Sequence, residues 1–361
     1  MSTDTSNEFS GTKPVAPQNA FDQDKLAAYM REHVAGFRGT LAVEQFKGGQ
    51  SNPTFRLSAG GKRYVLRRKP AGVLLPSAHA IDREYRVISA LAKTDVPVAK
   101  AHALCEDPSV LGTAFYIMDC VDGRIFWDPT LPDMSPAERS ALYSELNRVM
   151  AALHRVDPNA IGLGDYGKPG AYLERQVGRW TKQYRAAETE TIDAANRLID
   201  WLPRHMPQSD ETAVVHGDYR FDNVIFHPSE PRILAVLDWE LSTLGHPLVD
   251  FAYHCMSWRM GTEGGRGLAG VNLPLLGIPS EADYVATYLQ RTGRDKNALS
   301  QADWNYFMVF NMFRLVGIMQ GITHRALQGN AASEHAIESG KRARPLAEQA
   351  WALAQQIDAS R

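Results

Sequence analysis

The chain has little cysteine, no excess of charge of either sign and no apolar segment at its start. Each of these absences limits the classes of protein to which the chain can belong. Only three of its 361 residues are cysteines, and Cys105, Cys120 and Cys255 have no metal-binding spacing, which fits a reducing cytoplasm. The residues near Met1 form no apolar signal region. With 39 basic against 41 acidic side chains, we expect no general affinity for nucleic acid or membrane.

What is present is enough for a substantial core. The chain is 44% hydrophobic, and its length suits about two domains or lobes. Residues 1–22 are rich in Ser, Thr, Asn, Pro and Gln, so we expect a flexible tail there. No internal repeat is visible.

The most informative stretch reads HGDYRFDN over residues 216–223. Asp218 follows a short apolar run, Asn223 comes five residues later, and Asp238 follows the apolar run 233–237. Phosphoryl transfer from a nucleotide needs one carboxylate for the acceptor hydroxyl, and an amide and a second carboxylate for magnesium. These three residues supply those groups.

The spacing predicts that two of these residues converge. Residues 224–226 and 233–237 are apolar and are separated by HPSEP, which is typical of a hairpin. Asn223 then starts one strand and Asp238 ends its partner, so the two meet across the antiparallel pair. Mg²⁺ prefers such oxygen ligands. Asp and Asn are also common in turns, but a turn does not explain an acid directly after five apolar residues.

The HGDxxxxN motif with a following strand-borne Asp resembles the aminoglycoside phosphotransferase family, whose relatives are the choline kinases and, more remotely, the protein kinases. The resemblance implies an α+β, protein-kinase-like bilobal fold that binds ATP and Mg²⁺. A small antiparallel-sheet N-lobe would comprise residues 23–121, and a larger, mainly helical C-lobe would comprise residues 122–361. Asp218 would be the catalytic residue, Asn223 and Asp238 the metal ligands.

Two departures from the protein kinases matter. Gly217 replaces the Arg that precedes the catalytic Asp, and Asp238-Trp239-Glu240 replaces Asp-Phe-Gly. An activation loop regulated by phosphorylation is therefore not expected. Small molecules become better acceptor candidates than proteins.

A nucleotide lobe should precede this motif. In the strand-turn-strand pattern of residues 46–57, Gly48 and Gly49 let the backbone approach a phosphate, and Ser51 and Asn52 add donors. A Gly-Gly hairpin turn without a ligand has the same sequence.

The next strand carries a basic residue that, by the resemblance, contacts the phosphates and pairs with a helix Glu. Arg67 takes this place by register, although Arg68 and Lys69 are close enough to compete. Glu84 is the candidate partner, on a helix with apolar residues at 85, 88 and 91; a solvated Glu would look the same.

Further site residues follow from the resemblance. The apolar run 115–118 would lead to a hinge where adenine bonds backbone groups near Asp119 and Val121. Asp250 would brace the catalytic loop by hydrogen bonding, and His216 would have a similar packing role.

Capping boxes at 135–138 and 300–303 predict two helices. In the second, Arg314 lies near the middle of an apolar segment and favours a buried helix over a membrane span. The glycine-rich stretch 261–277 is either a loop that covers the acceptor or a plain surface loop.

The acceptor is the open question. Basic residues dominate 167–187, and a solvated face is their default meaning. The alternative is an anionic acceptor bound by Arg175, Arg179, Lys182 and Arg314.

A wider resemblance favours that alternative. The segments LRRKP at 66–70 and LLPSAH at 74–79 are similar to the kinase-like domain fused to some acyl-CoA dehydrogenases. This implies phosphorylation of a hydroxyacyl-CoA or hydroxy acid. An aminoglycoside or choline-like alcohol kinase remains an alternative. A nucleotide-binding protein without catalysis would be expected to have lost one of the three key residues, and none is lost.

Overall fold

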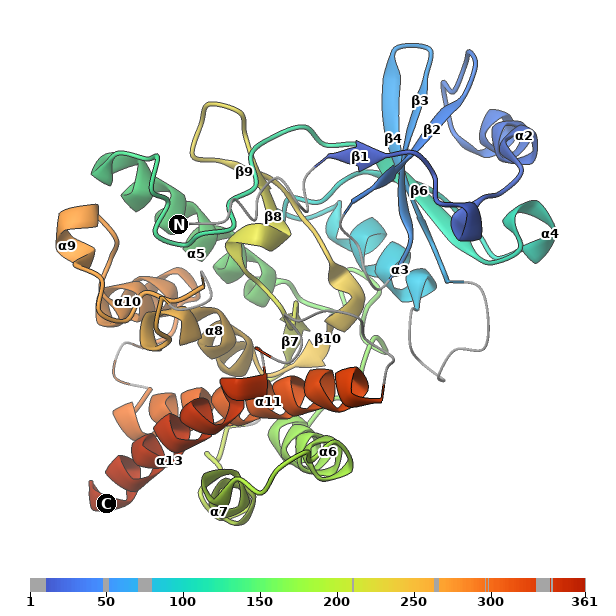
Figure 1. Ribbon diagram of the computed structural model, residues 1–361. Coiled ribbons are helices and arrows are strands. Elements are labelled where there is room, and N and C mark those ends of the chain that lie inside the picture. The colour runs from blue at the N-terminus through green and yellow to red at the C-terminus, as the bar shows by residue number, and fades with distance from the viewer. Residues whose placement is uncertain are drawn as a thin grey trace. The chain divides into compact units, whose positions relative to one another are not determined.

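A computed structural model describes residues 11–47, 52–70, 80–209, 211–262, 266–295, 297, 299–328, 338 and 340–360 of the protein (Figure 1). The chain forms two compact units. The first comprises the chain up to residue 152 with 159–163 and 220–242, and the second comprises 153–158, 164–219 and 243–361. The sequence predicts a single division after residue 121. The structure divides the chain at other positions, because residues 220–242, which follow residue 121, belong to the first unit.

The first unit contains a six-stranded antiparallel sheet in the order β1-β2-β3-β4-β6-β5. A separate two-stranded hairpin, β8-β9, belongs to the same unit. The strands are β1 Thr12–Lys13, β2 Ala42–Phe46, β3 Thr54–Ala59, β4 Lys62–Arg68, β5 Ala101–Cys105, β6 Phe115–Asp119, β8 Val224–Phe226 and β9 Ile233–Val236.

The central β3-β4 hairpin shows why this sequence folds as it does. Gly60 and Gly61 form its two-residue turn with φ of 56° and 77°, the left-handed conformation that glycine adopts at least cost. Along β3, inward residues alternate with partly exposed ones, so that Phe55 and Leu57 are fully buried. Their core cluster includes Leu26 of helix α2 (Gln23–His33).

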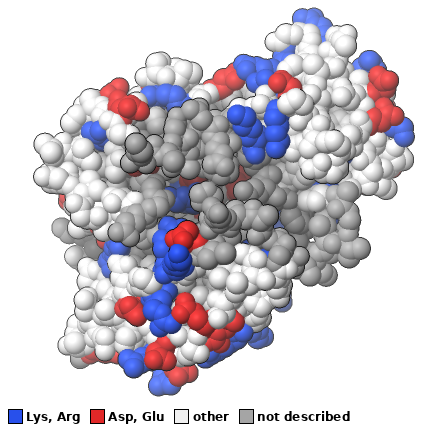
Figure 2. All heavy atoms as spheres, viewed as in Figure 1, with Lys and Arg blue, Asp and Glu red and all other residues white. Residues whose placement is uncertain are grey.

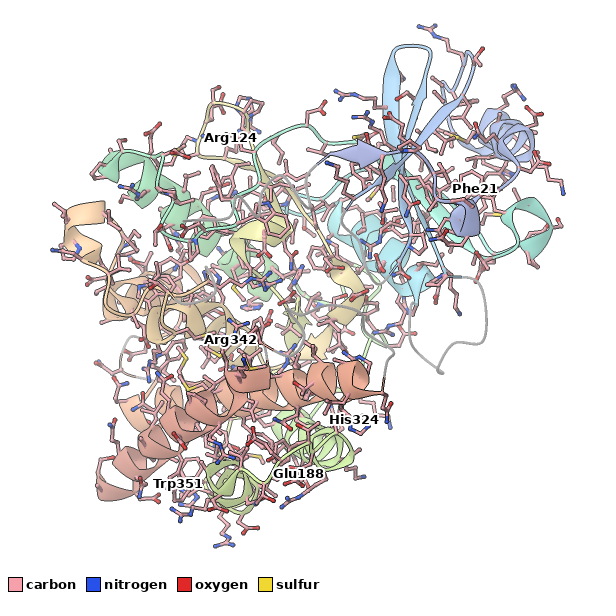
Figure 3. The ribbon with its side chains drawn as sticks, viewed as in Figure 1. Phe21, Arg124, Glu188, His324, Arg342 and Trp351 are labelled. Carbon is pink, nitrogen blue, oxygen red and sulfur yellow. The ribbon has the colours of Figure 1, made fainter. Side chains whose placement is uncertain are left out.

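The start of the chain is more ordered than its composition predicts. Within the stretch expected to be a flexible tail, β1 pairs with β2, and Pro17–Asn19 form a 3-10 turn, η1. Phe21, which Figure 3 labels, packs edge-on against Phe55 at 5.1 Å between ring centroids. The prediction of a flexible tail is therefore corrected for residues 11–22, because apolar contacts and a strand pairing hold them on the sheet.

The helices of the first unit complete its core. They are α2, α3 Ile81–Leu91, α4 Pro108–Leu111 and α5 Pro136–Arg155, with the 3-10 turns η3 Phe221–Asn223 and η4 Trp239–Leu241. The capping box predicted for α5 is present: the Ser135 amide donates to Glu138 at 2.8 Å, and the Glu138 amide donates to Ser135 at 3.3 Å. The last residues of α5, from Leu153 on, belong to the second unit.

The second unit is mainly helical. Its one described sheet pairs β7 Ala213–Val215 with β10 Thr243–Gly245. Its helices are α6 Tyr172–Ala186, α7 Asp193–Trp201, η2 Leu202–Arg204, α8 Pro247–Cys255, η5 Met256–Arg259, α9 Leu273–Leu276, α10 Glu281–Arg291, α11 Gln301–Leu327 and α13 Ala343–Ala359.

Helix α11 organises this unit and packs against α6, α8 and α13. Ser300 caps it as predicted, with the Asp303 amide donating to the serine hydroxyl at 3.0 Å. The prediction of a buried helix is confirmed, because Asn311 and Arg314 in its middle are 0% and 8% exposed. Across the described residues, none of the helices is both long and apolar enough to span a membrane.

Candidate active site

The HGD segment begins where strand β7 ends, as the sequence predicts. Gly217 has a φ of 84°, a left-handed conformation that favours glycine. The amides of His216 and Gly217 both donate to the Asp250 carboxylate, at 2.8 Å each. The hydrogen-bonded brace that the resemblance implies for Asp250 is therefore present, and it fixes the backbone immediately before Asp218.

The hydrogen-bond partners of the Asp250 side chain could not be predicted from the sequence. His154 Nε2 lies 3.1 Å from Asp250 Oδ2, and His154 Nδ1 lies 2.6 Å from the Tyr288 hydroxyl. The carboxylate only accepts, so Nε2 carries the proton that it donates to Asp250. Burial alone would raise the pKa of Asp250, but the hydrogen bond and charge of His154, with His216, hold it below its ordinary value.

The Asp218 side chain also has a partner that the sequence analysis missed. The hydroxyl of Tyr253, on α8, donates to Asp218 Oδ1 at 2.8 Å. The Asp218 amide donates to Nδ1 of the fully buried His216 at 3.1 Å. This contact fits the packing role predicted for the histidine. Sequence spacing contains no signal for Tyr253, because its partner lies 35 residues away.

Arg314, one of the residues that an anionic acceptor would contact, lies beside the HGD segment. Its Nη2 donates to the Gly217 carbonyl oxygen at 2.8 Å. Its guanidinium carbon lies 4.6 Å from the ring centre of Tyr253 and 5.4 Å from that of Trp180. A guanidinium that is 8% exposed and donates to the backbone supports the loop. Contact of Arg314 with an acceptor stays a prediction.

In the first unit, the predicted hairpin is confirmed. Val224 of β8 is opposite Val236 of β9, and the Leu237 amide donates to the Asn223 carbonyl oxygen at 2.8 Å. Asn223 and Asp238 are thus brought to the same end of the hairpin. Asp238 has a φ of 62°, which few residues other than Gly, Asn and Asp adopt readily.

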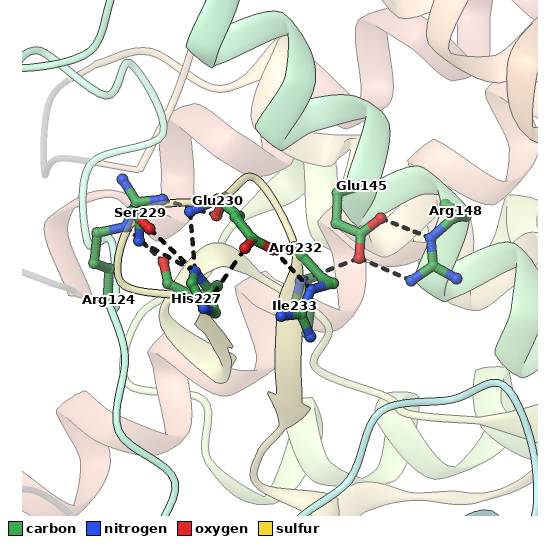
Figure 4. Close-up of polar contacts among 8 residues, drawn as sticks. All are labelled: Arg124, Glu145, Arg148, His227, Ser229, Glu230, Arg232 and Ile233. Atoms are coloured by element: carbon green, nitrogen blue, oxygen red, sulfur yellow. Dashed lines mark hydrogen bonds and ion pairs between the residues drawn. The ribbon is translucent and has the colours of Figure 1, made fainter.

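Side chains from elsewhere in the first unit fix this hairpin (Figure 4). Arg124 donates to the carbonyl oxygens of His227 and Glu230, at 2.9 Å each. Glu145 of α5 accepts from the Ile233 amide at 3.0 Å. Anchoring the tip and one strand in this way keeps the register that places Asn223 beside the chain leading to Asp238.

The same unit forms an ion-pair network around Arg67. Its Nε lies 3.0 Å from Glu84 Oε2, and its Nη2 lies 3.4 Å from Asp238 Oδ1. The predicted pairing of Arg67 with Glu84 is therefore present in the structure. One guanidinium links strand β4, helix α3 and the residue that ends the hairpin, as its forked geometry allows.

Burial and charge act together on this network. Burial raises the pKa of Glu84, and the nearby Arg67 only partly opposes this effect. Burial is the largest single influence and lowers the pKa of Arg67, but Glu84, Tyr116, Asp238 and Glu240 together outweigh it, and the net shift is upward. The Tyr116 hydroxyl donates to Glu84 Oε2 at 3.0 Å, and burial holds the pKa of that phenol well above its usual range.

Geometry separates Arg67 from Arg68, its neighbour in β4, although which of Arg67, Arg68 and Lys69 contacts the phosphates stays a prediction. Arg68 faces other partners: its guanidinium carbon lies 5.2 Å from the ring centre of Phe21, and its Nη2 donates to the Asn19 carbonyl oxygen at 3.1 Å. Successive strand residues point to opposite faces. Only Arg67 of the pair reaches Glu84.

The glycine turn lies mostly outside the described residues, which exclude Gly48, Gly49 and Ser51. Asn52 is described and is fully buried. Its amide nitrogen donates to Glu84 Oε1 at 3.1 Å. The amide expected to serve as a phosphate donor thus also supports the ion-pair network.

The predicted hinge follows β6. The amides of Asp119 and Cys120 donate to the carbonyl oxygens of Lys100 and Arg63, at 2.9 and 3.3 Å. The Asp119 side chain lies 2.7 Å from His102 Nε2. An adenine at this edge would therefore use the Asp119 carbonyl and the Val121 amide.

The predicted basic acceptor residues of α6 do not form one group. Arg175 donates to the carbonyl oxygens of Lys168 and Gly170, so it closes the turn before its own helix. Arg179 and Lys182 are exposed. Figure 2 shows basic and acidic side chains interspersed over the lower part of the face drawn, as on an ordinary solvated surface.

The stretch 261–277 contains regular structure. The Leu268 and Ala269 amides donate to the carbonyl oxygens of Ser257 and Met260, at 2.8 and 2.9 Å, and α9 follows. Residues 263–265 lie outside the described part of the chain. The middle of the stretch, at Leu268 and Ala269, is thus hydrogen-bonded to residues 257–260, and whether the stretch covers an acceptor stays a prediction.

The side chains of Asn223 and Asp238 suit a hard cation whose remaining ligands are phosphate oxygens and water. No group of three or more His, Cys, Asp or Glu side chains able to hold a metal occurs within the described ranges. Mg²⁺ needs no such cage, since it is usually bound by one or two carboxylates together with phosphate oxygens and water. The amide of Asn223 and the carboxylate of Asp238 fit this pattern.

Comparison with known proteins places the chain among phosphotransferases. Residues 42–296 match the phosphotransferase enzyme family, APH. Mouse acyl-CoA dehydrogenase family member 10 is 45% identical over 347 residues, which cover 95% of this chain and 32% of that protein. Mouse acyl-CoA dehydrogenase family member 11 is 44% identical over 354 residues, covering 96% and 45%. The chain spans less than half the length of these relatives.

Solved structures of other proteins support the same family assignment. A Ralstonia eutropha protein provisionally described as an aminoglycoside phosphotransferase is 59% identical, with a TM-score of 0.87 over 93% of this chain and 99% of that one. Choline kinase from Cryptosporidium parvum has a TM-score of 0.60 at 12% identity, covering 94% and 96%. The expected α+β, protein-kinase-like fold is confirmed, and the chain belongs to the phosphotransferase enzyme family.

Proposed function

We propose that the protein is an ATP-dependent kinase that transfers the γ-phosphate to a hydroxyl group of a small molecule. The observation that carries this proposal is the hairpin that brings Asn223 beside Asp238, with Arg67 within 3.4 Å of the Asp238 carboxylate. Family membership supplies the reaction class. The presence of all three polar residues, including Asp218, favours a catalyst over a nucleotide-binding protein without activity.

In this proposal the first unit holds the nucleotide. Arg67 contacts the phosphates while Glu84 orients it, and the adenine bonds the Asp119 carbonyl and the Val121 amide. Asn223 and Asp238 would hold Mg²⁺, which when bound neutralises charge on the β- and γ-phosphates. Nucleotide-bound relatives support this assignment, among them an aminoglycoside phosphotransferase in ternary complex with ADP and hygromycin B.

Asp218 would receive the acceptor. Its carboxylate accepts a hydrogen bond from the acceptor hydroxyl, orients the oxygen toward the γ-phosphorus and takes the proton as the new P–O bond forms and the bond to ADP breaks. The transition state of phosphoryl transfer is loose, so orientation contributes more than proton removal. The braces from Asp250 and Tyr253 suit this role.

We further propose an anionic or neutral acceptor, with a hydroxyacyl-CoA or hydroxy acid favoured over an aminoglycoside. Arg179 and Lys182 are exposed basic residues, and a polycation would meet like charge there. The relatives of known name are acyl-CoA dehydrogenase family members, and this name associates them with acyl-CoA compounds. Choline-like alcohols and aminoglycosides are the competing acceptors.

The test is a nucleotide-consumption screen with hydroxyacyl-CoAs, hydroxy acids, sugars, choline-like alcohols and aminoglycosides side by side. We expect turnover with an acyl-CoA or hydroxy acid. Asp218→Asn should reduce that turnover about a hundredfold or more while Mg-ATP binding stays nearly intact. Asp283→Asn, an exposed residue of α10, is the matched control. Wild-type turnover by the Asp218 variant would contradict the proposed role.

A charge reversal tests the acceptor class. Replacing Arg179 and Lys182 together with Glu should raise the Michaelis constant for an acyl-CoA acceptor, and added salt should shrink the effect by screening. The control reverses Lys25 and Arg31, exposed residues of α2, with the same change in net charge. Phosphorylation of kanamycin-like compounds without activity on acyl-CoAs would overturn this choice of acceptor.

A further inference from the structure

We propose that Tyr253 is a positioning residue that fixes the orientation of the Asp218 carboxylate, and that Arg314 and Trp180 hold the tyrosine ring in place. This inference rests on the proposed function, in which Asp218 orients the acceptor. It concerns three side chains that the sequence motif does not include, from α6, α8 and α11.

The first observation is that α8 supports both the backbone and the side chain of the HGD segment. Asp250 accepts from the amides of His216 and Gly217, and Tyr253 donates to the Asp218 carboxylate at 2.8 Å. Asp250 and Tyr253 are three residues apart, so they lie on one face of the helix. One rigid element therefore sets where the catalytic loop lies and how its carboxylate is turned.

The second observation is that the tyrosine ring is itself held. The Arg314 guanidinium lies 4.6 Å from the ring centre of Tyr253 and 5.4 Å from that of Trp180, and it is anchored by its bond to the Gly217 carbonyl oxygen. Such cation–π contacts strengthen where water is excluded, and Arg314 is buried. Swinging the Tyr253 hydroxyl away from Asp218 would require the ring to leave this stack.

The chemistry explains why a phenol suits this position. A neutral donor fixes one oxygen of the carboxylate without neutralising it, so Asp218 keeps its negative charge for the acceptor hydroxyl. A Lys or Arg donor would form an ion pair and compete with the acceptor. Because productive transfer depends on alignment, a carboxylate free to rotate would lose rate without losing nucleotide binding.

The experiment compares Tyr253→Phe with Tyr306→Phe. Tyr306 is a matched control, because it is a buried tyrosine of the same unit whose hydroxyl donates to the Leu202 carbonyl oxygen at 2.9 Å, away from the catalytic loop. We measure γ-phosphate transfer from Mg-ATP to water and to the best acceptor of the screen, Mg-ATP affinity by calorimetry, and the thermal unfolding midpoint.

Tyr253→Phe should lower kcat about tenfold and leave Mg-ATP affinity and the Michaelis constant for ATP within about twofold. Tyr306→Phe should lower the unfolding midpoint and leave kcat unchanged. Arg314→Met should reproduce the kcat loss, and Arg314→Lys should rescue part of it, because Lys keeps the charge but not the planar stack. In the Asp218→Asn background, removing the Tyr253 hydroxyl should have no further effect on kcat.

The outcomes separate the two proposals. Wild-type turnover by Asp218→Asn would contradict the proposed function. If Asp218→Asn loses turnover but Tyr253→Phe keeps full turnover, only the positioning role of Tyr253 is contradicted. A crystal structure of Tyr253→Phe gives an independent measurement where turnover is slow. We expect the Asp218 side chain to occupy a different rotamer or several; a single unchanged rotamer overturns the inference.

Discussion

In the first unit the carboxylates around the candidate metal site are paired with an arginine, whereas in the second unit the carboxylates around the HGD segment accept hydrogen bonds from a hydroxyl and from backbone amides. Arg67 links the carboxylates of Glu84 and Asp238. Asp218, by contrast, accepts from the Tyr253 hydroxyl, and Asp250 accepts from two backbone amides. The candidate metal site therefore depends on the balance of positive and negative charge. The candidate catalytic loop depends on the orientation of its side chains.

The difference has a chemical meaning. One arginine against two carboxylates leaves the first network with a formal deficit of positive charge, which suits a site that gains a divalent cation together with an anionic nucleotide. In the second unit, hydrogen bonds from rigid elements hold geometry with little change in charge. Disturbing the first should therefore change nucleotide affinity, and disturbing the second should change stability and kcat.

The largest expected effect comes from Asp250→Asn. The new amide group would turn a donor toward the backbone amides or His154, so buried donors lose their acceptor, and we expect the free energy of unfolding to fall by about 3 to 5 kcal/mol. Denaturant unfolding measures it. Asp303→Asn, at the exposed start of α11, should change stability by less than about 1 kcal/mol. Equal losses in both variants would contradict the special role of Asp250.

Asp238→Ala should have the next largest effect, on affinity. It removes the carboxylate beside Asn223, so Mg²⁺-dependent ATP affinity should fall by on the order of a hundredfold, while affinity without metal falls less. Calorimetry with and without Mg²⁺ measures both values. Glu230→Ala, an exposed residue at the tip of the same hairpin, is the control. An unchanged Mg-ATP affinity would rule out this metal site.

A pH titration sharpens the comparison within the second unit. His254 lies between the Tyr219 carbonyl oxygen, at 3.2 Å from Nδ1, and the Tyr284 hydroxyl, at 2.9 Å from Nε2. Burial lowers its pKa to about 4. The unfolded chain therefore takes up the proton first as the pH falls, and stability is lost between about pH 6.5 and pH 4.

This loss should amount to about 3 kcal/mol, at 1.36 kcal/mol for each pKa unit. His254→Gln keeps a donor and an acceptor at the site and should flatten the dependence in denaturant titrations across that pH range. His33→Gln, at an exposed position on α2, should leave the dependence unchanged. A steep pH dependence that persists in the His254 variant would assign the effect to other groups.

The smallest effect distinguishes the adjacent arginines Arg67 and Arg68 of β4. Arg67→Lys keeps the charge but cannot reach Glu84 and Asp238 with one fork, so ATP affinity should fall about tenfold. Arg68→Lys should lower stability through its lost contact with Phe21 and leave ATP affinity unchanged. The same affinity loss in both variants would show that the assignment of Arg67 is not specific.

Sequence alone was sufficient where chemistry follows from short spacing. The hairpin between Asn223 and Asp238 and the capping boxes at Ser135 and Ser300 depend on local patterns, and the structure confirms them. In these cases neighbouring residues in the sequence determine where the side chain points. The pairing of Arg67 with Glu84 is also present, but it was implied by the family resemblance.

Sequence was insufficient where a side chain is placed by a distant partner. Nothing near Tyr253 indicates a bond to Asp218, and nothing near His154 indicates one to Asp250, 96 residues away. Charge alone also did not indicate that Arg314 donates to the backbone of the HGD segment. Residues 11–22 were misjudged because a polar composition conceals the apolar anchor at Phe21.

The left-handed conformation of Gly217 also limits how this protein can change. In protein kinases an arginine precedes the catalytic aspartate, and here a glycine with a φ of 84° takes that place. An arginine at this position would carry a Cβ into a strained conformation, at a cost of about 1 to 2 kcal/mol. The Asp250 and Arg314 bonds pin the peptide and oppose its relaxation. The backbone conformation therefore disfavours the arginine that protein kinases carry at this position.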